Sequence, residues 1–98
     1  MIVKRAIRNS RTEYEVPDII TWDGFEEFVI STVKALQAEI TERHDGPDAR
    51  CWKVLVDGEI VLFYFDDIGL TWFVPEDRDS LQVALHVEDV LGSIQPPA

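Results

Sequence analysis

Residues 50–74 contain three segments rich in apolar residues, separated by turn signals at Asp57-Gly58 and at 66–69, and this pattern predicts a three-stranded antiparallel meander. The strands are expected near 50–57, 59–66 and 70–74, with Asp57-Gly58 as a type I′ turn. Pairing around this turn sends the apolar side chains to two faces. One face receives Trp52, Val54, Val56, Val61, Phe63 and Phe65, and the other receives Cys51, Leu55, Ile60, Leu62 and Tyr64. Because both faces of the sheet carry apolar side chains, we expect other parts of the protein or a second chain to cover each face at least in part.

Residues 2–16 predict a β-hairpin with strands at 2–8 and 12–16, joined by a turn at Asn9-Ser10. A two-residue turn sets Lys4 opposite Glu15 and places most apolar residues on the other face. Arg8 then lies opposite Arg11, which is unfavourable because like charges directly across a sheet repel. The hairpin is expected to extend the meander sheet.

Residues 22–43 carry the clearest helical pattern in the chain. Their apolar stripe consists of Phe25, Val29, Val33, Leu36 and Ile40. Thr21 or Asp23 can cap its start, and Gly46-Pro47 marks its end. The sequence therefore predicts one long helix packed against the sheet.

Residues 79–94 fit two patterns. Leu81, Val83, Leu85 and Val87 alternate as in a strand, whereas Val83, Val87, Val90, Leu91 and Ile94 form a helical stripe. Preceding acids and the following Gly92 and prolines favour a second helix. The expected architecture is α+β, in a single domain over residues 1–98 with a short flexible tail at 95–98.

The chain is acidic, with a formal net charge of −10 over 98 residues. Such a surface disfavours binding to nucleic acid or an anionic membrane and favours basic partners. A single cysteine, no signal-like N-terminus and no apolar run longer than residues 60–65 predict a cytoplasmic protein.

Residues that could carry chemistry are few and lack partners in the sequence. His44 and His86 have no second ligand at metal-binding spacing, Cys51 has no neighbouring histidine, and Asp66-Asp67 falls in a turn. No glycine-rich phosphate loop is present. We therefore expect no catalytic residue, metal or cofactor.

The predicted topology gathers acids at one end of the molecule. If the helix at 22–43 and the later strands run alternately up and down, the helix start, the Asp57-Gly58 turn and the 75–80 loop meet. This expected acidic end contains Asp23, Glu26, Glu27, Asp57, Glu59, Glu76, Asp77 and Asp79. Trp52 and Trp72 are the expected aromatic anchors beside it.

These features predict a small acidic protein-binding module. Its most concrete version is an inhibitor or immunity-type protein that covers a basic partner such as a toxin or nuclease. The alternative is a structural, self-associating domain in which a second copy covers the apolar sheet and forms a homodimer. An enzyme with a site assembled from scattered carboxylates is the third and least supported hypothesis.

Overall fold

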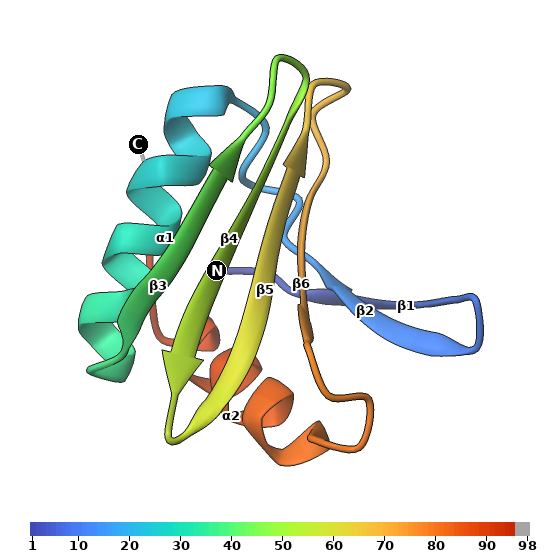
Figure 1. The fold of residues 1–98 in the computed structure, drawn as a ribbon, viewed down its shortest axis with the longest axis vertical. Helices are drawn as coiled ribbons and strands as arrows, with labels where there is room; N and C mark the ends of the chain where they lie inside the picture. Colours follow the sequence, from blue (N-terminus) through green and yellow to red (C-terminus); the bar gives the residue numbers. More distant parts are fainter. Residues whose placement is uncertain (96–98) are drawn as a thin grey trace.

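The computed structural model describes residues 1–95 and has an α+β architecture, as predicted (Figure 1). The predicted tail at 95–98 lies, apart from Gln95, outside the described residues. In chain order the elements are β1 (Lys4–Arg8), β2 (Arg11–Glu15), α1 (Trp22–Leu36), β3 (Glu39–Asp45), β4 (Ala49–Val56), β5 (Glu59–Asp66), β6 (Thr71–Pro75) and α2 (Leu81–Gly92). The strands form one antiparallel sheet in the order β1-β2-β6-β5-β4-β3.

The N-terminal hairpin has the predicted register. Lys4 pairs with Glu15 and Arg8 pairs with Arg11. Asn9 and Ser10 both have positive φ angles, 52° and 61°, as a type I′ turn requires. Only Tyr14 and Glu15 of β2 pair with β6, so the hairpin joins the sheet at its root and projects beyond it (Figure 1).

The meander is also confirmed, with Asp57 and Gly58 at φ angles of 49° and 82° in its first turn. The six side chains predicted to share one face are all buried in the core: Trp52, Val54, Val56, Val61, Phe63 and Phe65. Phe25 of α1 packs edge-on against Trp52, and Phe28 does so against Phe63. Aromatic packing therefore joins this helix to the sheet.

The predicted helix over 22–43 is wrong beyond Leu36. Gln37 adopts the left-handed conformation with φ 54°, and the amide of Ala38 donates to the carbonyl of Val33. These contacts are those of a Schellman motif, which ends a helix. A glycine usually takes the left-handed position, so glutamine gave no stop signal, and Ile40 happened to extend the helical stripe.

Residues 39–45 instead form β3, an edge strand of the sheet. Ile40 is its one partly buried residue, and the other six residues of β3 are exposed. A bulge between Ile40 and Glu42 shifts its register against β4. This additional strand reverses the direction of β4, β5 and β6 relative to α1. The β3–β4 and β5–β6 turns consequently lie at the start of α1, whereas the β4–β5 turn lies at the other end (Figure 1).

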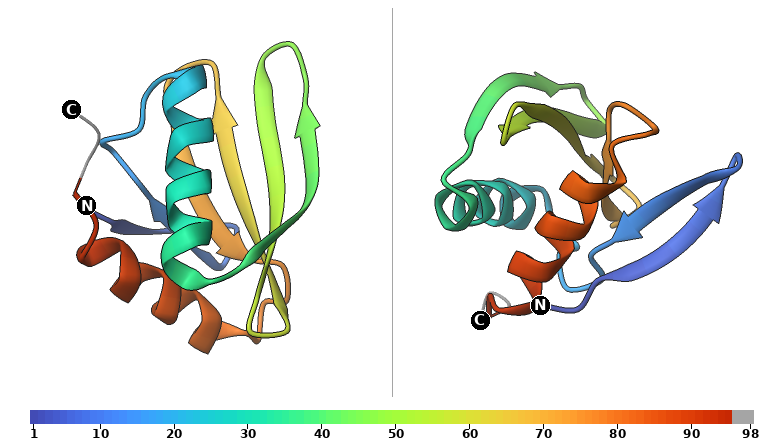
Figure 2. Two further views of the ribbon diagram at one scale, coloured as in Figure 1. Left: turned by 90° about the vertical axis from the view of Figure 1, so that its left-hand side faces the viewer. Right: turned by 90° about the horizontal axis from the view of Figure 1, so that it is seen from below.

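Residues 81–92 are helical as favoured by the sequence, so the strand reading of this segment is wrong. Both helices pack on the same face of the sheet (Figure 2). Among residues 1–95, no helix covers the opposite face, where Cys51, Leu55, Ile60, Leu62, Tyr64 and Trp72 remain partly exposed. Neither described helix has the length and apolar character needed to cross a membrane.

The helix end at Leu36 makes a testable prediction. Gln37→Gly should raise the free energy of unfolding by about 0.5–1 kcal/mol, because glycine adopts a left-handed φ without the steric cost of a side chain. Lys34→Gly, three residues earlier and inside α1, should lower it by about 1 kcal/mol. Urea denaturation measures both. A helix that continued to residue 43 would make both substitutions destabilising.

Candidate binding surface

The eight carboxylates predicted to share one end divide between opposite ends of the molecule, which corrects the predicted acidic end. Asp23, Glu26 and Glu27 lie at the start of α1. The other five, Asp57, Glu59, Glu76, Asp77 and Asp79, lie near the β4–β5 turn and the loop before α2. The error follows from β3, because one extra strand moves every later turn to the other end.

The end that contains the Asp57-Gly58 turn uses much of its charge internally. Glu59 accepts a hydrogen bond from Ser80 at 2.9 Å, and Asp57 lies 3.8 Å from His86. Glu76 lies 3.6 Å from Lys53, and Asp77 caps the backbone amide of Asp79 at 3.0 Å. Four of these five acids therefore have a partner within the molecule.

A different set of acids gathers at the opposite end, which we call the Trp22 end. It consists of the start of α1, the β3–β4 turn and the β5–β6 turn (Figure 1). The amide of Asp67 donates to the carbonyl of Asp48 at 2.9 Å, which joins the two turns. Its acids are Asp18, Asp23, Glu26, Glu27, Asp45, Asp48, Asp66 and Asp67. A hollow of about 350 Å³ beside the helix start is lined by three of them, Asp18, Asp23 and Glu27.

The Trp22 end also carries exposed apolar side chains, which we call the Trp22 patch. Exposed fractions are 79% for Ile68, 64% for Ile20, and 37% for both Trp22 and Leu70. Gly69 holds the β5–β6 turn against Ile20 with a φ of 89°, and a Cβ there would lie 3.6 Å from the Ile20 carbonyl oxygen. An apolar centre surrounded by charged groups is the usual anatomy of a protein-binding surface.

The buried side chain of Arg50 holds Trp22 in place. This side chain is only 5% exposed, and its Nη1 donates to the Trp22 carbonyl at 2.9 Å. The guanidinium carbon lies 4.6 Å from the centre of the Trp22 ring and 4.8 Å from that of Trp52. The guanidinium thus contacts both indoles, and its cation–π contact and hydrogen bond with Trp22 restrict this residue and so reduce the entropy it would lose on binding.

Asp45 balances the buried charge of Arg50. Its carboxylate accepts from Arg50 Nε at 2.7 Å and Nη2 at 3.3 Å, and from the Trp52 indole at 2.9 Å. Hydrogen bonding to Arg50, followed by that to Trp52, outweighs partial burial and lowers the pKa of Asp45. The pair is therefore ionised at neutral pH.

The two tryptophans predicted as surface anchors have other positions. Trp52 is fully buried in the core, so its predicted role as a surface anchor is wrong. Trp72 is partly exposed and stacks on Tyr64 at 5.1 Å, on the sheet face that the helices leave open. Neither lies in the Trp22 patch, where Trp22 is the aromatic residue.

The residues considered for chemistry lie apart from one another. Among the described residues, no three His, Cys, Asp or Glu side chains are placed to hold a metal ion. His44 lies at an exposed position 2.9 Å from Glu42. Burial raises the pKa of the Cys51 thiol, so little of it is the nucleophilic thiolate at neutral pH.

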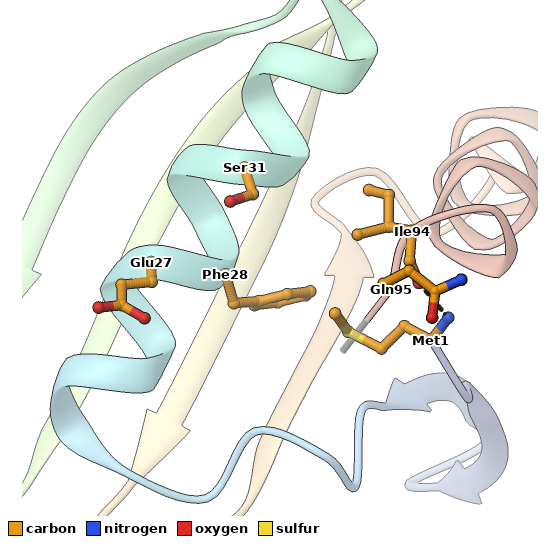
Figure 3. Close-up of a pocket in the computed structure, with 6 residues that line it drawn as sticks. All are labelled: Met1, Glu27, Phe28, Ser31, Ile94 and Gln95. Carbon is orange, nitrogen blue, oxygen red and sulfur yellow. Dashed lines mark hydrogen bonds between the residues drawn. The ribbon is translucent and has the colours of Figure 1, made fainter. Parts of the chain in front are cut away.

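A smaller cavity of about 110 Å³ lies between α1 and the segments next to both chain ends (Figure 3). The side chains of Phe28 and Met1 point toward each other across it. The Met1 ammonium group donates to the carbonyls of Leu91 and Ile94, so its charge is engaged by the end of α2. The side chains of Met1, Phe28 and Ile94 give this cavity an apolar wall, and its one cationic group is already hydrogen-bonded.

The Trp22 patch was missed because its members come from two segments, 20–22 and 68–70, that are far apart in the sequence. A local signal did exist, since Ile68 interrupts the turn Asp66-Asp67-Ile68-Gly69 and Ile20 precedes the helix cap. An isoleucine in a polar turn is unusual, because turns usually lie in water and favour polar residues. Their convergence depends on β3, which the sequence pattern did not reveal.

Comparisons with protein-family models, with curated proteins and with solved structures found no match to this chain.

The Asp45–Arg50 pair generates a stability prediction. Asp45→Asn should lower the free energy of unfolding at pH 7 by about 2 kcal/mol, less than for a fully buried pair because Asp45 is 38% exposed. Since the folded-state pKa of Asp45 is lowered, its contribution is complete above about pH 4 and is lost as pH falls through the folded value. The variant should therefore lose less stability than the wild type on acidification.

Asp48→Asn is the matched control, because it removes an acid from the adjacent turn that forms no ion pair among the described residues. Urea denaturation between pH 3 and pH 7 measures all three proteins. Equal stabilities for the two variants at pH 7 would contradict a role for Asp45 in neutralising Arg50.

Proposed function

We propose that this chain is a small protein-binding module whose partner presents a basic surface to the Trp22 end. The observation that carries the proposal is that four exposed apolar side chains lie on two segments that meet at Gly69 and Ile20, at the end of the molecule that also carries eight acids. Apolar groups at the centre would supply affinity by burial, and the surrounding acids would supply orientation and faster association. This moves the expected binding region from the predicted acidic end to the Trp22 end.

Charge pairing supports a basic partner. Asp18, Asp23, Glu27, Asp48, Asp66 and Asp67 form no ion pair within residues 1–95. The two nearby bases are already engaged, Arg43 at 3.7 Å from Glu26 and Arg50 by Asp45. The free charge of the Trp22 end is therefore negative, and it would attract Lys- or Arg-rich surfaces.

The most specific form of the proposal is an inhibitor or immunity-type protein. A basic active site, such as that of a nuclease, has the charge needed to meet the acids of the Trp22 end. The rigid hold of Arg50 on Trp22 supports this form, because preorganised anchors favour tight binding. Loss of the partner's enzymatic activity on addition of the chain would distinguish inhibition from binding alone.

Substitution within the patch tests the proposal. The immobilised chain would capture proteins from a lysate of the natural host at low salt, and the dissociation constant of the retained basic protein would then be measured. Trp22→Ala should weaken binding about 30-fold or more, as expected for a central aromatic anchor. Ile68→Ser should weaken it several-fold without disturbing the core, because Ile68 is 79% exposed.

Trp72→Ala is the matched control on the open sheet face, and it should change affinity by less than about twofold. Raising salt from 0.1 to 0.5 M should lower affinity, since exposed charges are screened over shorter distances. A captured protein whose affinity depends on Trp72 and not on Trp22, or does not respond to salt, would refute the proposal.

A second candidate function is self-association through the open sheet face. The favouring observation is that both helices cover one face, which leaves Leu62, Tyr64 and Trp72 partly exposed on the other. A symmetric dimer would bury these groups. Sedimentation velocity from 5 to 500 μM should then show a dimer that Leu62→Lys disrupts. A single monomeric species throughout would remove this candidate.

A further inference from the structure

Three arginines line one hollow at the tip of the N-terminal hairpin. The hollow has a volume of about 280 Å³ and is lined by Arg8, Asn9, Arg11, Glu13 and Arg78. A second hollow of about 140 Å³ shares Arg11 and Arg78 with it and adds an apolar wall that includes Tyr14, Pro75 and Leu81. This concentration of cations is notable in a chain with a net charge of −10.

The pairing within the hairpin places two of these cations directly across the sheet. Arg8 and Arg11 are partners in the register, an arrangement that repels unless an anion lies between or beside them. Arg8 is compensated by Glu13 at 3.6 Å and by a contact with Glu15. Arg11 has no ion pair among the described residues, so its charge remains to be neutralised.

The guanidinium of Arg11 also lacks hydrogen-bond acceptors. Its Nε and Nη2 atoms are buried and have no partner within residues 1–95. These two atoms form the edge of the guanidinium that commonly binds both oxygens of a carboxylate or phosphate. Leaving them unpaired is unfavourable. A ligand in the hollow would reach them once the Arg11 side chain turned outward, and pairing them with two oxygen acceptors would favour that movement.

Arg78 is held beside Arg11 by the turn itself. Its Nη2 donates to the carbonyls of Ser10 at 3.3 Å and Asn9 at 3.4 Å. These long bonds orient the guanidinium and leave its remaining N–H groups for another acceptor. The type I′ turn thus brings a residue of the loop before α2 to the hairpin tip, 68 positions away in the sequence.

We propose that the hollow formed by Arg8, Arg11 and Arg78 is a binding site for an oxyanion, either a phosphate group or a carboxylate. Arg11 and Arg78 supply the donors, and Arg8 adds positive charge from across the hairpin. Its volume equals that of roughly nine water molecules, which is sufficient for inorganic phosphate. The site is separate from the Trp22 end and has the opposite charge preference.

A titration followed by amide NMR signals tests the site, with inorganic phosphate and acetate as separate probes at pH 7. Sodium chloride would hold the ionic strength constant, because a change in ionic strength would by itself alter the interactions of exposed charges. We expect saturable shifts centred on the amides of Asn9, Ser10, Arg11 and Arg78. The probe that binds more tightly identifies the phosphate or the carboxylate form.

Charge variants separate this site from general attraction between ions. Arg11→Gln and Arg78→Gln should each weaken binding about tenfold, the loss of one charge-assisted hydrogen bond. Glu13→Gln should strengthen binding, because it removes the one carboxylate that lines the hollow. Lys34→Gln is the matched control, since Lys34 is exposed on α1 and forms no ion pair in the described structure.

Arg78 is exposed, so its variant should retain the circular dichroism spectrum of the wild type and keep the test valid if Arg11→Gln is unstable. Shifts that are spread over all basic residues, fail to saturate, or saturate in Arg78→Gln at the same probe concentration as in the wild type would overturn the proposal. Equal responses to phosphate, acetate and chloride would overturn it as well.

Discussion

The ion pair between Arg50 and Asp45 determines how the two halves of this fold meet. A guanidinium that is 95% removed from solvent requires both an anion and hydrogen-bond acceptors, and here β3 supplies the anion while α1 supplies a carbonyl. Its aromatic neighbours, Trp22, Phe25 and Trp52, come from the helix and from β4. One side chain therefore joins the helix start to the edge of the sheet, and it positions the Trp22 patch above it.

The Trp22 end and the hairpin tip present surface charges of opposite sign. The bases nearest the Trp22 end are used to hold its structure, so that end presents its acids to solvent. The hairpin tip has the reverse arrangement, because Arg11 and Arg78 have few internal acceptors. A bulk charge of −10 therefore conceals two surfaces of opposite sign, and a description by net charge alone would miss the basic one.

Much of the fold could be predicted where short-range patterns decide the structure. The Asp57-Gly58 turn, the hairpin register and the shared face of the meander follow from local turn chemistry and alternation. The end of α1 could not be predicted, because Gln37 occupies a left-handed position usually taken by glycine and Ile40 continues the helical stripe. β3 is held by backbone pairing and by Asp45, and neither interaction produces a recognisable pattern of hydrophobic residues. Because β3 decides at which end each later turn lies, the residues of the binding surface could not be predicted either.

The bulge between Ile40 and Glu42 has a consequence for how the sheet ends. The two edge strands carry opposite charge, with Lys4, Arg5 and Arg8 on β1 and mainly acids on β3. Edges of opposite sign attract, so charge repulsion would not prevent one molecule from adding its β1 to the β3 of another. The bulge breaks the regular spacing of donors and acceptors along β3, and it thereby opposes growth of the sheet into a continuous fibre.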